Sequence, residues 1–259
     1  MMMRSGNPTL NAQTFQPTGQ MATGQTMTLQ GTINKTLALL ALLVLSASWV
    51  WGKVTVPQTQ MFGEAVAAQQ NNVAPFMMLG AIGGFIMAMV TVFKREWSGI
   101  TAPIYALLEG LFLGGISAYF ELQYPGIVMQ AVGLTFGTLF CLLMAYKSGL
   151  IKPTENFKLG VVAATGAIAL LYFVSMIMGF FGHSIGFIYS SGPVGIGFSL
   201  IVVTVAALNL VMDFDFIEQG AQRGLPKYME WYGAFGLMVT LVWLYIEFLR
   251  LLAKLNNRR

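Results

Sequence analysis

Residues 159–212 form a run of 54 residues that contains no Asp, Glu, Lys or Arg. About 20 apolar residues cross the hydrocarbon core of a bilayer as a helix, so this run is long enough for two spans. The Ser-Ser-Gly-Pro sequence at 190–193 supplies a turn between them. Because backbone polar groups in lipid must be satisfied within the structure itself, the spans are predicted to be helices.

The remainder of the chain has the same character. Only 9% of its 259 residues are charged, against about 25% in soluble domains, and 56% are hydrophobic. These figures argue against a soluble protein and leave no room for a sizeable extramembrane domain. Uncharged apolar runs predict seven spans, at 36–51, 73–93, 100–120, 127–146, 159–182, 196–217 and 228–252. The predicted fold class is therefore an all-α membrane protein, a bundle of seven transmembrane helices.

The two ends of the chain are polar. Residues 1–33 are rich in Gln, Thr, Gly and Asn and carry a single charge, Arg4, so we expect a disordered tail. Residues 34–254 are predicted to form the transmembrane domain, and 255–259 a short basic tail. Because the first apolar run begins only at Thr36, we expect a retained span and not a cleaved signal peptide.

Composition also excludes several classes of site. The single cysteine, Cys141, lies in an apolar run, which argues against a disulfide framework and a cysteine-based zinc site. The net charge of +4 comes from basic residues placed singly at the ends of spans, where lipid headgroups are the expected partner and nucleic acid is not. No Gly-x-x-x-x-Gly-Lys stretch is present, which argues against nucleotide-driven pumping.

The distribution of Lys and Arg between loops predicts the orientation. With the N-terminus in the cytoplasm, nine basic residues gather on the cytoplasmic side: Arg4, Lys35, Lys94, Arg95, Lys147, Lys152, Lys158, Arg223 and Lys227. The opposite loops contain only Lys53. We therefore expect a multi-pass protein of the cytoplasmic (inner) membrane with a cytoplasmic N-terminus. The basic residues at 250–259 disagree, so the last helix either lies in the bundle centre and ignores the rule or does not fully cross.

Glycines four residues apart recur in three of the spans. Such spacing lets helix backbones approach closely in lipid, and we interpret the pairs as packing seams. The pairs are Gly80 with Gly84, Gly110 with Gly114, and Gly133 with Gly137.

Apart from Glu230 at the start of the last span, four acids fall inside the predicted spans: Glu109, Asp213, Asp215 and Glu247. A charge at the bilayer centre costs at least about 2.5–3.5 kcal/mol on insertion scales, so each acid requires an explanation. Glu109 and Asp213 are candidates for a proton-sensitive or cation-coordinating site, the alternative being buried acids that only fix packing. Asp215 is more simply explained as a solvated helix end, and Glu247 can pair with Arg250 three residues later.

The chemistry expected of such acids is proton and calcium binding. Two carboxyls held close together in a low dielectric cannot both ionise cheaply and tend to share one proton, so a pair can act as a pH switch. When ionised, the same oxygens suit calcium, whereas the lone His183 and Cys141 argue against zinc or copper. We expect no cofactor other than transiently bound calcium.

Several stretches together resemble one known family. They are Arg-Ser-Gly-Asn-Pro at 4–8, Tyr-Ala-Leu-Leu-Glu-Gly-Leu-Phe-Leu-Gly at 105–114, Asn-Leu-Val-Met-Asp-Phe-Asp-Phe-Ile-Glu at 209–218, Glu-Trp-Tyr-Gly at 230–233 and Leu-Tyr-Ile-Glu-Phe-Leu-Arg at 244–250. Over nearly its whole length the chain resembles the Bax inhibitor-1 family, also called transmembrane Bax inhibitor motif proteins, in its bacterial YccA-like branch.

The resemblance implies a seven-helix bundle whose last helix is surrounded by the other six, and a calcium leak gated by pH. In that family an acid on the sixth helix and one on the seventh form a hydrogen-bonded carboxyl pair that controls opening. The matching positions are Asp213 and Glu247, which would also be the transient calcium ligands, and a basic latch on the second helix corresponds to Arg95. Some bacterial relatives bind a membrane-embedded AAA protease, which implies a protein partner.

Two departures from the family pattern affect this pair. Glu247 stands where the family has Asp, and it follows Asp213 by 34 residues, a longer separation than the family pairing has. With a turn near Gly224 and Pro226 and a rise of about 1.5 Å per residue, the two carboxyls differ in depth by about two and a half turns. Glu109 is therefore an alternative partner for either acid.

The favoured function is a pH-sensitive calcium or cation leak with no enzymatic activity. Its alternative is a non-transporting regulator that binds a membrane protease or other membrane proteins. A proton-coupled transporter would be expected to show repeated halves, and no clear internal repeat is evident. An intramembrane serine protease at Ser117 would need a histidine at the same depth, whereas His183 lies in a predicted loop.

Overall fold

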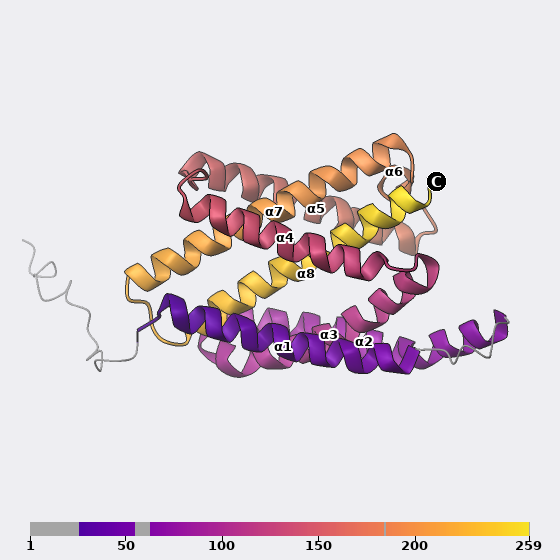
Figure 1. Ribbon diagram of the computed structural model, residues 1–259, viewed down its shortest axis with the longest axis horizontal. Helices are drawn as coiled ribbons and strands as arrows, with labels where there is room; N and C mark the ends of the chain where they lie inside the picture. The colour runs from indigo at the N-terminus through magenta and orange to yellow at the C-terminus, as the bar shows by residue number, and fades with distance from the viewer. Residues whose placement is uncertain (1–25, 55–62, 184, 259) are drawn as a thin grey trace, which may run out of the picture.

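The computed structural model describes residues 26–54, 63–183 and 185–258, and within them it shows seven long helices and no β-strand. The long helices are α1 (Leu29–Val54), α2 (Gly63–Phe93), α3 (Ser98–Gln123), α4 (Ile127–Lys147), α5 (Glu155–Phe180), α7 (Pro193–Gln222) and α8 (Met229–Asn256) (Figure 1). A 3-10 turn, η1 (Arg95–Trp97), precedes α3, and the four-residue α6 (Gly186–Tyr189) precedes α7. All seven long helices contain a segment that is long and apolar enough to cross a membrane, which confirms the predicted fold class.

The helices follow the predicted apolar runs and extend beyond most of their ends. α1 begins at Leu29, so residues 29–33, which the sequence placed in the polar tail, are helical. Residues 1–25, the rest of that tail, lie outside the described residues. At the other end, α8 continues to Asn256, into the predicted basic tail. Polar first and last turns explain these differences, because a helix can continue past the apolar core of a bilayer.

The last helix is the most deeply buried of the seven. Met238, Leu244 and Leu249 of α8 are almost inaccessible to solvent. This helix packs against α1, α3, α4 and α7, and it reaches α5 through a hydrogen bond from Tyr172. In contrast, α2 packs mainly on α1 and α3. The expected central position of the seventh span is confirmed, although α2 lies outside the ring of helices that packs on it.

Two of the three glycine seams lie where helices pack closely. A Cβ atom on Gly110 or Gly114 of α3 would collide with the backbone of α1 at Leu43 or Ala47. Gly80 of α2 lies equally close to the backbone of α3. The third seam differs, because Gly133 and Gly137 of α4 have open space around the positions where a Cβ would stand.

The last helix crosses the whole bundle. Near its start, Glu230 lies beside the beginning of α1, and near its end Lys254 reaches the segment before α7. The Lys254 ammonium donates to the carbonyl oxygens of Ile188 and Gly195 at 2.6 and 3.0 Å and to the Ser199 hydroxyl at 2.8 Å. The beginning of α1 and the C-terminus therefore lie at opposite ends of the bundle (Figure 1). We call the end where α1, α3, α5 and α8 begin the basic end.

Candidate functional site

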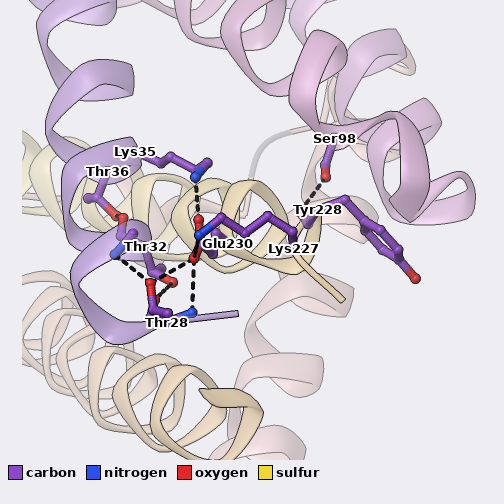
Figure 2. Close-up of polar contacts among 9 residues, drawn as sticks. Thr28, Thr32, Lys35, Thr36, Ser98, Lys227, Tyr228 and Glu230 are labelled. Atoms are coloured by element: carbon purple, nitrogen blue, oxygen red, sulfur yellow. Dashed lines mark hydrogen bonds and ion pairs between the residues drawn. The ribbon is translucent and has the colours of Figure 1, made fainter. Parts of the chain in front are cut away.

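Glu230, at the start of α8, is the acid with the most donors around it. Its side chain is fully buried, and its carboxylate accepts hydrogen bonds from the Thr28 amide at 2.9 Å and the Thr28 hydroxyl at 2.8 Å. Lys227 pairs with the same carboxylate at 2.7 Å, and Lys35 of α1 forms a second ion pair with it (Figure 2). We call these four residues the Glu230 cluster.

The Glu230 cluster joins the start of α1 to the start of α8 at the basic end, and neighbouring hydrogen bonds add α3 and the turn before α8. A Cβ atom on Gly31 would collide with the Glu230 carboxylate, so glycine at this position lets the carboxylate stay among its donors. Next to it, the Met27 amide donates to the Leu225 carbonyl oxygen at 2.7 Å. The Ser98 hydroxyl, at the start of α3, donates to the carbonyl oxygen of Tyr228 at 3.0 Å (Figure 2).

The sequence analysis missed Glu230 as a buried acid. It stands two residues after the predicted start of the last span, where an acid normally reaches solvent. One of its two lysine partners, Lys35, precedes it by 195 residues, and that pairing is set only by the tertiary fold. The sequence did place several lysines at the same predicted end of the bundle, and these could have indicated an ion pair with Glu230.

Asp213 has one buried carboxyl oxygen without a hydrogen-bond partner among the described residues. It lies on α7 and faces α8, where its Oδ1 is 3.9 Å from the position that a Cβ of Gly236 would take. The Thr240 hydroxyl lies next to this carboxyl and donates to the Gly236 carbonyl oxygen at 3.2 Å. The other oxygen, Oδ2, is fully buried and has no hydrogen-bond partner among the described residues. The interface between α7 and α8 therefore contains a carboxyl oxygen that could accept a hydrogen bond or bind a cation.

Glu247, on α8, has partners of its own. Its side chain is only 1% exposed, and its two oxygens accept hydrogen bonds from the Tyr172 hydroxyl at 3.1 and 3.3 Å. Arg250, one turn later, donates to it at 2.9 Å, as the sequence spacing suggested. The Arg250 guanidinium also lies over the Tyr172 ring.

The structure does not bring Asp213 and Glu247 together. Asp213 lies level with Gly236 and Thr240, and Glu247 follows Thr240 by seven residues, a rise of about 10 Å along α8. No hydrogen bond joins the two acids in the part of the chain that the structure describes. The carboxyl pair implied by the family resemblance is therefore absent at these positions, because the separation along α8 is too long.

Glu109 faces away from both of these acids. It lies on α3 and shares a hydrogen bond with Tyr105 of the same helix. Its Oε2 is 3.0 Å from the position that a Cβ of Gly84 would take on α2. The Tyr105 ring in turn packs edge-on against Phe235 of α8. Glu109 therefore belongs to the α2–α3 seam, and within the described residues it forms no hydrogen bond with either candidate partner.

Asp215 and Arg95 lie at the basic end. Asp215 pairs with Lys158 of α5 at 2.9 Å and accepts a hydrogen bond from Gln219 at 2.6 Å. Its side chain is 15% exposed and lies two turns before the end of α7, so it is less solvated than the sequence suggested. The exposed Arg95 lies with its guanidinium 5.4 Å from the ring centre of Tyr232. Arg95 forms no ion pair with an acid among the described residues, so the structure does not show it as a latch.

The acids are dispersed along the bundle. Within the described residues, no three His, Cys, Asp or Glu side chains gather closely enough to hold a metal ion. Calcium prefers six to eight oxygen ligands, so an ion at Asp213 would take most of its shell from water. The arrangement suits weak, passing contact with a cation more than a permanent metal centre.

The seven apolar helices define a multi-pass membrane protein. A family model described as Bax inhibitor 1 like matches residues 7–257, nearly the whole chain. The protein therefore belongs to the Bax inhibitor 1-like family, as the sequence motifs indicated. A comparison with curated proteins found no match.

Proposed function

We propose that this Bax inhibitor 1-like protein is a pH-sensitive cation leak, with calcium as the expected ion. The observation that carries the proposal is the buried Oδ2 of Asp213, which has no hydrogen-bond partner among the described residues. A buried carboxylate oxygen without a donor is costly unless it binds a proton or a cation. The proton and the cation then compete for one carboxyl, and this competition makes the leak depend on pH.

Asp213 is well placed to control the packing of two helices. It lies between α7 and α8, next to Gly236 and Thr240. With a proton bound, the neutral carboxyl is tolerated in this interface and the two helices stay packed. Without the proton, an unpaired charge in a low dielectric favours separation of the helices and entry of water. Cation flux should therefore fall as the pH is lowered.

Glu247 and Glu230 are less suited to this role because their charges are already balanced. Glu247 is paired with Arg250, and Glu230 with Lys35 and Lys227. An acid that is satisfied in its ionised form gains little from a proton. The proposal assigns neither an enzymatic activity nor a resident cofactor to the protein.

We further propose a cytoplasmic membrane location with the basic end in the cytoplasm. Cytoplasmic loops carry the excess of Lys and Arg in membrane proteins. In this structure eight described basic residues lie at or near the basic end: Lys35, Lys94, Arg95, Lys147, Lys152, Lys158, Arg223 and Lys227.

The test is calcium release from dye-loaded liposomes that contain the purified full-length protein, between pH 5 and pH 8. We expect wild-type flux to decrease toward acidic pH and Asp213→Asn to remove this dependence. Glu247→Gln is the matched control, because it neutralises a buried acid that already has partners. It should change the amount of flux without removing its pH dependence.

One outcome would contradict the leak, and another would contradict the assignment of Asp213 as its gate. If liposomes with and without the protein release calcium alike at every pH, the protein does not conduct, and a non-transporting regulator becomes the better candidate. That regulator would be sought as a complex with a membrane-embedded protease. If flux persists but Asp213→Asn keeps the wild-type pH profile, Asp213 is not the gate.

A further inference from the structure

A small pocket lies at the basic end between the start of α5 and the last turns of α7. Its volume is about 260 Å³, and its polar walls are formed by Lys158, Asp215, Gln219 and Arg223. Its other walls include Met212, Phe216 and Leu225. The pocket thus combines charged groups with apolar side chains at the end of membrane-spanning helices.

The polar side chains form a continuous chain of hydrogen bonds. Lys158 lies 2.9 Å from an Asp215 oxygen, and Gln219 donates to the same oxygen at 2.6 Å. Arg223 donates to the Gln219 side-chain oxygen at 2.9 Å. Glu155, which is 92% exposed, contacts Lys158 from outside the pocket at 3.4 Å. In the described part of the chain, two cations and a single acid therefore line the pocket, and together they give it a positive formal charge.

Arg223 has donors to spare. A guanidinium carries five N–H groups, and the side chain makes one hydrogen bond to the described residues, with Gln219. Lys158 has three ammonium hydrogens and contacts two carboxylates. The remaining donors suit an anion with several acceptor oxygens, and a phosphate group meets that description.

We infer that this pocket binds the phosphate group of an anionic phospholipid, with Lys158 and Arg223 as its ligands. Basic pockets between membrane helices are suited to anionic headgroups. Phe216 and Met212 provide an apolar wall for the lipid next to the charged groups. Free inorganic phosphate presents the same chemistry but would make no use of that wall.

The effect of Asp215 on phosphate affinity provides a test of this inference. Among the described residues it is the only acid that lines the pocket, and it holds Lys158 in an ion pair. A bound phosphate competes with Asp215 for Lys158, so removing the Asp215 charge should strengthen phosphate binding. A cation site at Asp215 requires the opposite, because there the carboxylate would be the ligand and Lys158 the competitor.

The experiment is native mass spectrometry of the full-length protein. The protein is mixed in detergent with equal amounts of phosphatidylglycerol and phosphatidylcholine, and the lipid that stays bound after the detergent is removed is measured. We expect the wild type to retain phosphatidylglycerol in preference. Each basic side chain near anionic lipid is worth roughly a fivefold change in affinity, so Arg223→Gln and Lys158→Gln should each lower retention by about that factor. Asp215→Asn should raise it. Lys94→Gln, which removes an exposed charge at the same end but outside the pocket, is the matched control and should lower retention clearly less than either pocket variant.

Three results would overturn the inference. Equal retention in the wild type and Arg223→Gln excludes the pocket, and this variant leaves the Lys158–Asp215 ion pair intact. Weaker retention in Asp215→Asn, with thermal unfolding unchanged, points to a bridging cation in place of a direct phosphate contact. Displacement of phosphatidylglycerol by millimolar inorganic phosphate assigns the site to free phosphate. The assay needs no ion flux, so its outcome is independent of the leak proposal.

Discussion

Three acids of the bundle, Glu230, Glu247 and Asp213, differ in the donors that surround their carboxyl oxygens. Glu230 has two lysines and two Thr28 donors, Glu247 has an arginine and a tyrosine, and one oxygen of Asp213 has no donor among the described residues. A buried charge is stable when it is fully paired. At the residue scale, Glu230 and Glu247 are therefore expected to hold the fold, and Asp213 to respond to protons.

Glu230→Gln should destabilise the protein. The substitution leaves Lys35 and Lys227 without their shared carboxylate and replaces an acceptor by an amide group. Breaking a buried ion pair costs about 3–5 kcal/mol, and we expect the lower end because Lys227 is half exposed. Thermal unfolding in detergent measures the effect. Glu155→Gln, at an exposed acid, is the control, and an equal shift in both variants would contradict a structural role for the Glu230 cluster.

Gly31→Ala should also destabilise the protein, although alanine normally favours a helix. The added Cβ would collide with the Glu230 carboxylate and displace it from Thr28, Lys35 and Lys227. Gly166→Ala, in the middle of α5, meets open space and should be neutral or stabilising by up to about 1 kcal/mol. We expect the thermal unfolding temperature to fall for Gly31→Ala and to stay the same or rise for Gly166→Ala. If the unfolding temperature does not fall for Gly31→Ala either, the contact at Gly31 relaxes without loss of stability.

At the element scale, the spans could be predicted from the sequence and their side-chain partners could not. A span is set by local apolar length, so all seven helices were found. Partners depend on how each helix is rotated about its axis, and that is a tertiary property. The rise per residue along α8 already showed that Asp213 and Glu247 differ in depth. It gave no indication that Tyr172 would lie beside Glu247 or that Glu109 would turn toward Gly84.

The three glycine seams give a prediction at the same scale. Gly114→Leu should disrupt the packing of α3 on α1, because the space is taken by the α1 backbone at Ala47. Gly137→Leu places the same side chain in open space on α4. Overpacking costs typically about 1–3 kcal/mol, and contact with backbone argues for the upper part of this range. The yield of folded protein and its thermal unfolding temperature should fall only for Gly114→Leu.

At the scale of the whole molecule, basic residues lie at both ends of the bundle, because the last helix crosses it. The positive-inside rule favours a cytoplasmic basic end, yet the C-terminal basic residues lie at the other end. The structure explains how α8 can ignore the rule. Lys254 is buried and held by three acceptors, and Arg250 is paired with Glu247, so neither charge is free to direct the topology.

A cysteine-labelling experiment tests this arrangement in intact cells. In a Cys141→Ser background, Lys94→Cys places a thiol at the basic end and Asn257→Cys places one at the opposite end, both at exposed positions. A maleimide that cannot cross the membrane should label Asn257→Cys from outside and Lys94→Cys only after permeabilisation. Labelling of both thiols from the same side would mean that α8 does not cross, because seven crossing helices put the two positions on opposite faces. Labelling of Lys94→Cys alone from outside would keep the seven spans and reverse the proposed orientation.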